Sequence, residues 1–310
     1  MLEAKHLTKI YGDFRAVEDV SFDVAKGQCI GLLGLNGAGK TTLLRMLACL
    51  LSPTSGTALV GGKDVGEDSL GVRESIGFLP ETPPLYGEMQ VGRFLAFVAR
   101  LRRVPAALVE ARVNEAVSRC QLDGVVEQTI ETLSFGFRKR VGIAQAIVHQ
   151  PPVVLLDEPI AGLDPKQIVE MRELVKRLHG EHTILLSSHI LTEISQTCDR
   201  ILVMHKGRIA AQGSEDELTP KAHLGVRVRA LGTREKLAAA LQGVPGLERV
   251  EVAPAAGDVV EARLECREDV RPAVAAAVIG AGLGLLELGA SELALESVFL
   301  TLIGSREARR

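Results

Sequence analysis

A glycine-rich segment near the N-terminus constrains the fold of this chain more than any other stretch. It follows the pattern G-x-x-x-x-G-K-[ST], in which glycines let the backbone wrap closely around a polyphosphate. The N–H groups of such a loop point inward and run into a helix N-terminus, which favours anions. The segment consists of Gly34, Leu35, Asn36, Gly37, Ala38, Gly39, Lys40, Thr41 and Thr42. We expect the Lys40 ammonium to contact the β- and γ-phosphates of a nucleotide, and the Thr41 hydroxyl to ligate Mg²⁺.

The sequence on both sides of the loop predicts the structural context that the loop needs. Residues 28–33 form an apolar run typical of a short buried strand, and residues 42–48 have the apolar spacing of a helix. A strand, a phosphate loop and a helix in that order predict an α/β fold.

Composition and charge restrict the class of protein. Hydrophobic residues make up 46% of the 310 residues and charged residues 24%, which is typical of a globular chain. The net charge of −3 gives no broad basic face, so we expect no nucleic-acid partner. The five cysteines are far apart and form no C-x-x-C pair, which favours reduced thiols in a cytosol over disulfides or a zinc site.

No membrane-spanning or targeting segment is expected. The first residues are polar and charged, unlike a secretory signal peptide. The longest uncharged run near the C-terminus, Pro272 to Leu286, is shorter than the roughly 20 residues that a membrane span needs. We therefore expect a protein that is soluble by itself and that acts at a membrane only through a partner.

Two carboxylates follow an apolar run typical of a buried parallel strand, residues 153–156. Ligands of open α/β sheets bind at the carboxyl ends of the strands, where Asp157 and Glu158 lie. Asp157 suits the Mg²⁺ ion of a nucleotide, and Glu158, on the opposite face, suits a group that orients or deprotonates water. The alternative is two ordinary loop acids.

Further candidates lie at strand and helix ends. His189 follows the apolar strand 183–188 and is expected to contact the γ-phosphate, although a lone histidine is often structural. Ser134 and Gly136 precede a helix and offer a second anion-binding surface, with a plain N-cap as the alternative for Ser134. Arg138 to Arg140 are interpreted as a solvated basic face, and Tyr11 either stacks on a base or merely ends a strand.

Changes in periodicity predict the domain organisation. Residues 88–149 form a helical insert, in which Pro105 starts a second helix. Residues 215–223 are charged and proline-bearing, which indicates a linker between a domain of residues 1–218 and a smaller one of residues 219–310. The smaller domain has the predicted order β-α-β-β-α-β of a ferredoxin-like unit, followed by a helix over residues 291–302. Because it shows no cluster of histidines, cysteines or acids, we expect a role in regulation or assembly.

In this order the motifs resemble those of the ATP-binding subunit of ABC (ATP-binding cassette) transporters, over about residues 1–213. The resemblance implies a RecA-like P-loop core with an antiparallel β subdomain and a helical subdomain. It identifies residues 34–42 as the Walker A motif, 133–137 as the signature, 155–158 as Walker B with the catalytic Glu158, 161–164 as the D-loop, His189 as the switch histidine and Tyr11 as the adenine-stacking aromatic.

Two positions depart from the family pattern. The signature is normally L-S-G-G-Q, and here Phe135 and Phe137 replace its third and fifth residues, whereas Ser134 and Gly136 are retained. Glu81 stands at the Q-loop glutamine, from which its carboxylate can approach Mg²⁺. These features resemble the drug-resistance and gliding-motility branch, whose members serve integral membrane permeases of the ABC-2 type.

The resemblance also implies a mechanism and a location. Two copies face head to tail as a homodimer, and ATP lies between Lys40, Thr41 and Asp157 of one copy and Ser134 and Gly136 of the other. Closure of the dimer drives a permease, which holds the chain in the cytoplasm at the inner face of the membrane and contacts residues 86–94.

Three alternatives remain open. A non-transport ABC ATPase tends to have tandem cassettes, long coiled-coil inserts or zinc modules, none of which this sequence shows. A GTPase or small-molecule kinase would leave residues 133–137 unexplained, and no N-K-x-D segment occurs. A regulatory module without turnover would not need Lys40, Asp157, Glu158 and His189.

Overall fold

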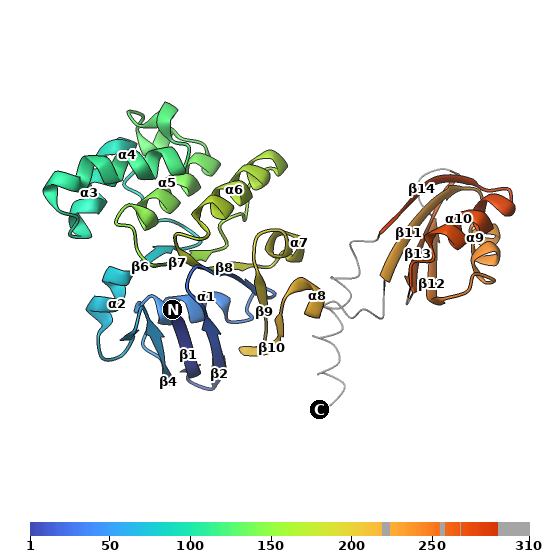
Figure 1. Ribbon diagram of the computed structural model, residues 1–310, viewed down its shortest axis with the longest axis horizontal. Helices are drawn as coiled ribbons and strands as arrows, with labels where there is room; N and C mark the ends of the chain where they lie inside the picture. The colour runs from blue at the N-terminus through green and yellow to red at the C-terminus, as the bar shows by residue number, and fades with distance from the viewer. Residues whose placement is uncertain (219–223, 255–257, 267, 291–310) are drawn as a thin grey trace. The chain divides into compact units, whose positions relative to one another are not determined.

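The computed structural model describes residues 1–218, 224–254, 258–266 and 268–290 (Figure 1). The chain divides into two compact units, Met1–Ser214 and Glu215–Arg310. In the described part of the chain, no helix has both the length and the apolar character needed to cross a membrane.

A six-stranded sheet forms the centre of the first unit, in the order β10-β9-β3-β8-β7-β6. Its strands are β3 (Cys29–Leu33), β6 (Ile76–Leu79), β7 (Val153–Asp157), β8 (Thr183–Ser188), β9 (Arg200–His205) and β10 (Arg208–Gly213). All neighbours run parallel except β10, which is antiparallel to β9. Every residue of β3, β7 and β8 is buried, as expected for parallel strands covered on both faces, so the buried strands predicted there are confirmed. Their carboxyl ends meet at one edge, where the phosphate loop, Glu158 and His189 follow.

A second, antiparallel sheet has the order β2-β1-β4-β5. Its strands are β1 (Leu2–Tyr11), β2 (Phe14–Val24), β4 (Ser55–Val60) and β5 (Lys63–Asp64). Helix α1 (Lys40–Leu47) packs against both sheets, because Leu43, Leu44 and Leu47 share one core with apolar residues of β1, β2, β3 and β9. This packing fixes the helix that begins at the phosphate loop.

A group of helices forms a separate layer of the unit, in green in Figure 1. It contains α3 (Val91–Leu101), α4 (Val109–Arg119) and α5 (Phe135–Ile147), which share an apolar core with α6 (Pro165–Leu178). Asp164 caps α6 by accepting a hydrogen bond from the Gln167 N–H at 2.9 Å, as predicted. The start of the second helix differs from the prediction: Pro105 precedes a 3₁₀ turn at Ala106–Leu108, and α4 begins only at Val109.

Among the described residues, three short α-helices have no counterpart in the sequence-based expectations. They are α2 (Ser69–Ser75), α7 (Leu191–Ser195) and α8 (Glu215–Leu218), the last within the expected linker. Each spans no more than two turns, so its apolar residues are too few to establish a helical period.

The second unit contains a four-stranded antiparallel sheet in the order β12-β13-β11-β14. Its elements are α8 (Glu215–Leu218), β11 (Leu224–Leu231), α9 (Arg234–Leu241), β12 (Leu247–Pro254), β13 (Val259–Cys266), α10 (Arg271–Gly280) and β14 (Gly284–Ala290). The predicted β-α-β-β-α-β order is confirmed, with Val260, Ala262 and Leu264 of β13 buried on one face. The helix predicted over residues 291–302 lies outside the described residues.

A buried histidine makes the stability of the first unit depend on pH. The Nε2–H of His149 donates to the Ile76 carbonyl at 3.0 Å, whereas its Nδ1 is buried without a partner. Burial, reinforced by the Arg102 charge, lowers the pKa of His149 to about 4, against about 6.5 in an unfolded chain. The unfolded chain therefore binds more protons between these values, and stability falls as the pH falls through this window.

We expect the wild type to lose about 2 kcal/mol more free energy of unfolding between pH 7.5 and pH 5 than the His149→Gln variant. The glutamine amide can still donate to the Ile76 carbonyl but does not titrate. Urea denaturation at the two pH values measures the difference. An identical pH dependence of the two proteins would show that His149 is not the responsible group.

Candidate nucleotide-binding site

The phosphate loop connects β3 to α1 and has a backbone that only glycine adopts easily. Gly39 has φ 102°, and a Cβ there would lie 2.4 Å from the Ala16 carbonyl oxygen. A Cβ at Gly34 would lie 2.7 Å from the Met204 carbonyl oxygen. Gly39 also has no side chain that could cap the first turn of α1. The N–H groups of that turn are therefore available to an anion.

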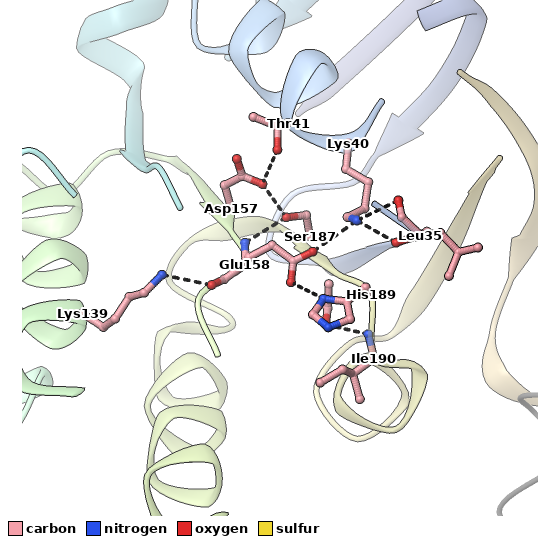
Figure 2. Close-up of polar contacts among 11 residues, drawn as sticks. Leu35, Lys40, Thr41, Lys139, Asp157, Glu158, Ser187, His189 and Ile190 are labelled. Atoms are coloured by element: carbon pink, nitrogen blue, oxygen red, sulfur yellow. Dashed lines mark hydrogen bonds and ion pairs between the residues drawn. The ribbon is translucent and has the colours of Figure 1, made fainter. Parts of the chain in front are cut away.

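Lys40 is the first residue of α1, and its side chain is only 6% exposed. Its ammonium donates to the carbonyl oxygens of Gly34 at 2.6 Å and Leu35 at 3.4 Å, and it lies 3.2 Å from Glu158 Oε1 (Figure 2). Buried charges are stable only when paired and hydrogen-bonded, and this ammonium is both. The loop thus holds a positive charge at the place where a phosphate chain would lie.

Asp157 ends β7 and joins α1 to β8. Its Oδ1 accepts hydrogen bonds from the Thr41 hydroxyl at 3.2 Å and the Ser187 hydroxyl at 2.7 Å. Its Oδ2 is buried and has no hydrogen-bond partner in the described structure. A buried carboxylate oxygen without a donor suits a hard cation, and the neighbouring hydroxyl is an oxygen ligand of the kind that Mg²⁺ takes.

The described residues contain no group of three or more His, Cys, Asp and Glu side chains arranged to hold a metal. Mg²⁺ at nucleotide sites is held by one or two protein oxygens together with phosphates, and the Asp157 carboxylate and the Thr41 hydroxyl supply such oxygens. The residues present therefore fit a magnesium ion that arrives with its nucleotide.

Glu158 follows β7 with φ 47°, a left-handed backbone that is unfavourable for a residue with a Cβ. Its N–H donates to the Ser187 hydroxyl at 2.9 Å. Its Oε1 faces Lys40, and its Oε2 accepts a hydrogen bond from His189 Nδ1–H at 2.9 Å (Figure 2). The structure thus brings Lys40, Asp157, Glu158 and His189 together from three separate segments.

Lys40, Glu158 and His189 line a cavity of about 450 Å³, and Asp157 contacts Thr41 in its wall. Its lining consists of Phe14, Ala16, residues 35–42, Glu81, Glu158, Ala161 and His189. Tyr11 is exposed at the end of β1, outside this lining, and the Lys9 ammonium lies 5.3 Å from its ring centre. Phe14, opposite Tyr11 in the β1–β2 register, lines the cavity instead, and the sequence reasoning missed it. The short Tyr11–Phe14 turn was the signal that both aromatics lie at one hairpin tip.

Comparison with known proteins identifies the family. The profile of the ABC transporter family matches residues 17–161. The uncharacterized ABC transporter ATP-binding protein YxlF of Bacillus subtilis is 38% identical over 79% of this chain and 81% of its own length. The chain belongs to the ABC transporter ATP-binding proteins. It is accordingly an ATPase.

Other relatives have a similar sequence identity over a somewhat shorter part of the chain. The bacitracin transport ATP-binding protein BcrA of Enterococcus faecalis is 37% identical, over 70% of each chain. The daunorubicin resistance ATP-binding protein DrrA3 of Streptomyces coeruleorubidus is 39% identical, over 70% of this chain and 68% of its own. A solved ATP-binding subunit of an ABC transporter matches with a TM-score of 0.64 and 31% identity, over 70% of this chain and 91% of the other.

Residues 133–137, which resemble the ABC signature, lie at the N-terminus of α5, apart from the cavity. The Ser134 hydroxyl accepts a hydrogen bond from the Phe137 N–H at 3.4 Å, so the N-cap interpretation of Ser134 holds. Neither Ser134 nor Gly136 is among the residues that line the cavity of their own chain. Phe135 and Phe137, which replace family residues, are both exposed next to them.

The basic run 138–140 is not the solvated face that the sequence predicts. Lys139 is 1% exposed and Arg140 is 8% exposed. Arg140 pairs with Glu170 of α6 and donates to the Gln121 side chain at 2.8 Å. The prediction was wrong because α5 is covered on most sides, so its long basic side chains must reach buried acceptors. Sequence periodicity does not reveal such acceptors, since they lie on segments far along the chain.

Proposed function

We propose that this chain is the ATP-hydrolysing subunit of an ABC exporter that works with a separate integral membrane permease of the ABC-2 type. The observation that carries the proposal is the meeting of Lys40, Glu158 and His189 at the cavity beside the phosphate loop, with Asp157 bonded to Thr41 of its wall. The similarity to proteins named for bacitracin transport and daunorubicin resistance supports export as the direction.

In this proposal ATP lies along residues 34–42, with Lys40 turning from its present partners towards the β- and γ-phosphates. Thr41 and Asp157 would hold Mg²⁺, and the Glu81 carboxylate, which lines the cavity, would lie near it. When bound, the ion neutralises charge on the phosphate oxygens. The base would contact the aromatic tip of the β1–β2 hairpin, formed by Tyr11 and Phe14.

Glu158 and His189 would act on the attacking water. The Glu158 carboxylate lies at the cavity wall, where it can accept a proton from water as the oxygen attacks the γ-phosphorus. The Nδ1–H of His189 orients this carboxylate at 2.9 Å. To contact the γ-phosphate as well, the ring would have to donate from an Nε2–H, because phosphate oxygens only accept hydrogen bonds.

A second copy of the chain would complete the site. The hydroxyl of Ser134 and the amide of Gly136 are anion-binding groups that their own cavity does not use. In a head-to-tail homodimer each signature would cover the nucleotide of the partner, and two equal sites would form by the two-fold symmetry.

The permease would dock on exposed apolar side chains of the helical layer. Tyr86, Phe97 and Leu101 are exposed, and the Tyr86 ring lies 5.8 Å from that of Phe97. Phe97 and Leu101 are one helical turn apart on α3 and so share a face. Such a cluster on a rigid helix suits an apolar protein partner, and docking there would place the chain at the inner face of the membrane.

We expect affinity purification from membranes of the native host to recover this chain together with an integral membrane protein. Tyr86→Asp should reduce that recovery about tenfold, because a carboxylate would be buried in the interface. Leu50→Asp, at an exposed leucine elsewhere, is the matched control. Equal recovery with both variants would contradict this docking site, and the absence of any integral partner would contradict the transport function.

A further inference from the structure

We propose that Lys139 is a positioning residue, which holds the backbone of Glu158 and the loop at Glu81 in register with the signature helix. This inference rests on the proposed role of Glu158. It starts from a charge that the site described above does not use, because the Lys139 ammonium is buried and lies outside the lining of the nucleotide cavity.

The contacts of Lys139 join three functional segments. Its ammonium donates to the carbonyl oxygen of Glu81 at 2.6 Å and to that of Glu158 at 3.2 Å. It also lies 5.7 Å from the ring centre of Phe135, within the range of a cation–π interaction. One side chain of α5 therefore contacts the loop after β6, the residue after β7 and the signature itself.

The acceptors are main-chain carbonyls, so the side chain fixes backbone positions. Burial lowers the pKa of the Lys139 ammonium, and the charges of Glu81, Asp157 and Glu158 act in the opposite direction. A buried ammonium must be hydrogen-bonded to remain charged, and here it donates to the carbonyl oxygens of Glu81 and Glu158 in two loops. Displacing either loop would leave a buried donor unsatisfied.

Glu158 is the residue most in need of such a restraint. Its left-handed backbone, at φ 47°, persists only if the surroundings fix it. Ser187 binds its N–H, and Lys139 binds its carbonyl oxygen from the side of the residue opposite Lys40 (Figure 2). Without Lys139 the peptide after Glu158 could rotate, and the carboxylate would leave the position from which it meets the water.

The test separates positioning from binding. In Lys139→Met the apolar stem is kept and the donor is lost, and we expect kcat of ATP hydrolysis to fall about 10- to 100-fold. The Kd for a fluorescent ATP analogue should stay within about twofold of wild type, because Lys139 does not line the cavity. Lys139→Arg, which can donate to both carbonyls, should recover most of the rate.

Arg140→Met is the matched control, since it removes the next buried cation of α5. Arg140 bonds to Glu170 and Gln121 and lies 5.7 Å from the Phe137 ring centre, and its hydrogen bonds and ion pair reach neither Glu81 nor Glu158. It should lower thermal stability yet keep kcat within about threefold. If Lys139→Met does not fold, Lys139→Gln replaces it, because its shorter amide cannot span both carbonyls.

Wild-type kcat in folded Lys139→Met, or in Lys139→Gln where it replaces that variant, would overturn the inference, as would an equal loss of kcat in Arg140→Met. Loss of ATP binding together with kcat would also overturn it. Glu158→Gln separates failure of the proposed function from failure of the positioning role. If Glu158→Gln hydrolyses ATP at the wild-type rate, the proposed function itself fails; if Glu158→Gln is slow but Lys139→Met hydrolyses at the wild-type rate, the positioning role alone fails.

Discussion

Replacing Glu158 with glutamine will lower the rate of ATP hydrolysis about 100-fold or more while ATP binding persists. The amide cannot accept a proton from water, yet it has nearly the shape of the carboxylate. Removing the charge also frees Lys40, which is 3.2 Å from Glu158 Oε1, from its anionic partner. Binding of a polyphosphate by Lys40 should therefore be retained or strengthened.

The same substitution should trap the proposed dimer, because nucleotide that is not hydrolysed keeps the two copies together. Phosphate release measures the rate, and size-exclusion chromatography with ATP and Mg²⁺ measures the dimer. Glu173→Gln, at an exposed glutamate of α6, is the control and should leave both unchanged. Hydrolysis at the wild-type rate in Glu158→Gln, without a stable dimer, would contradict the role assigned to Glu158.

The sequence predicted those site residues whose position follows from a short continuous segment. The phosphate loop needs a fixed spacing of glycines and Lys40, and Asp157 and Glu158 directly follow a run of buried residues. His189 likewise follows a buried strand. Because the carboxyl ends of parallel strands share one edge, placing each residue after its strand was enough to predict that they meet.

The residues that the sequence reasoning missed depend on tertiary contacts. Ser187 donates to Asp157 and accepts from Glu158, which could be known only once β7 and β8 were placed side by side. Phe14 lines the cavity because of the β1–β2 register. Lys139 is buried because α5 packs under two loops that come from other parts of the chain.

The fold shows the same division. Long apolar runs predicted the parallel strands, and alternation predicted β13 with its buried face. The short helices that were missed, α2, α7 and α8, have 7, 5 and 4 residues, too few for their apolar spacing to predict a helix. The local sequence pattern thus predicts the long strands and helices. The short helices depend on contacts with residues distant in sequence.

Lys40→Met should abolish ATP hydrolysis, with a loss of about 100-fold or more, because no other ammonium lines the cavity among the described residues. The loss should be in binding as well as in rate, since Lys40 is proposed to contact the phosphates in the ground state. ATP should then no longer raise the melting temperature of the protein, whereas it should do so for wild type. Lys166→Met, at an exposed lysine of α6, should behave as wild type in both measurements.

Mixing this variant with Ser134→Arg tests whether the two half-sites come from different copies. Each variant alone should be inactive, because each homodimer has two defective sites. A heterodimer, however, combines the intact phosphate loop of the Ser134→Arg copy with the intact signature of the Lys40→Met copy. Equal mixing makes about half of the dimers mixed, each with one of two sites intact, so about a quarter of the wild-type rate should return. If differently tagged copies co-purify but the mixture stays inactive, Ser134 does not complete the site of its partner, and the phosphate loop and the signature must serve separate purposes.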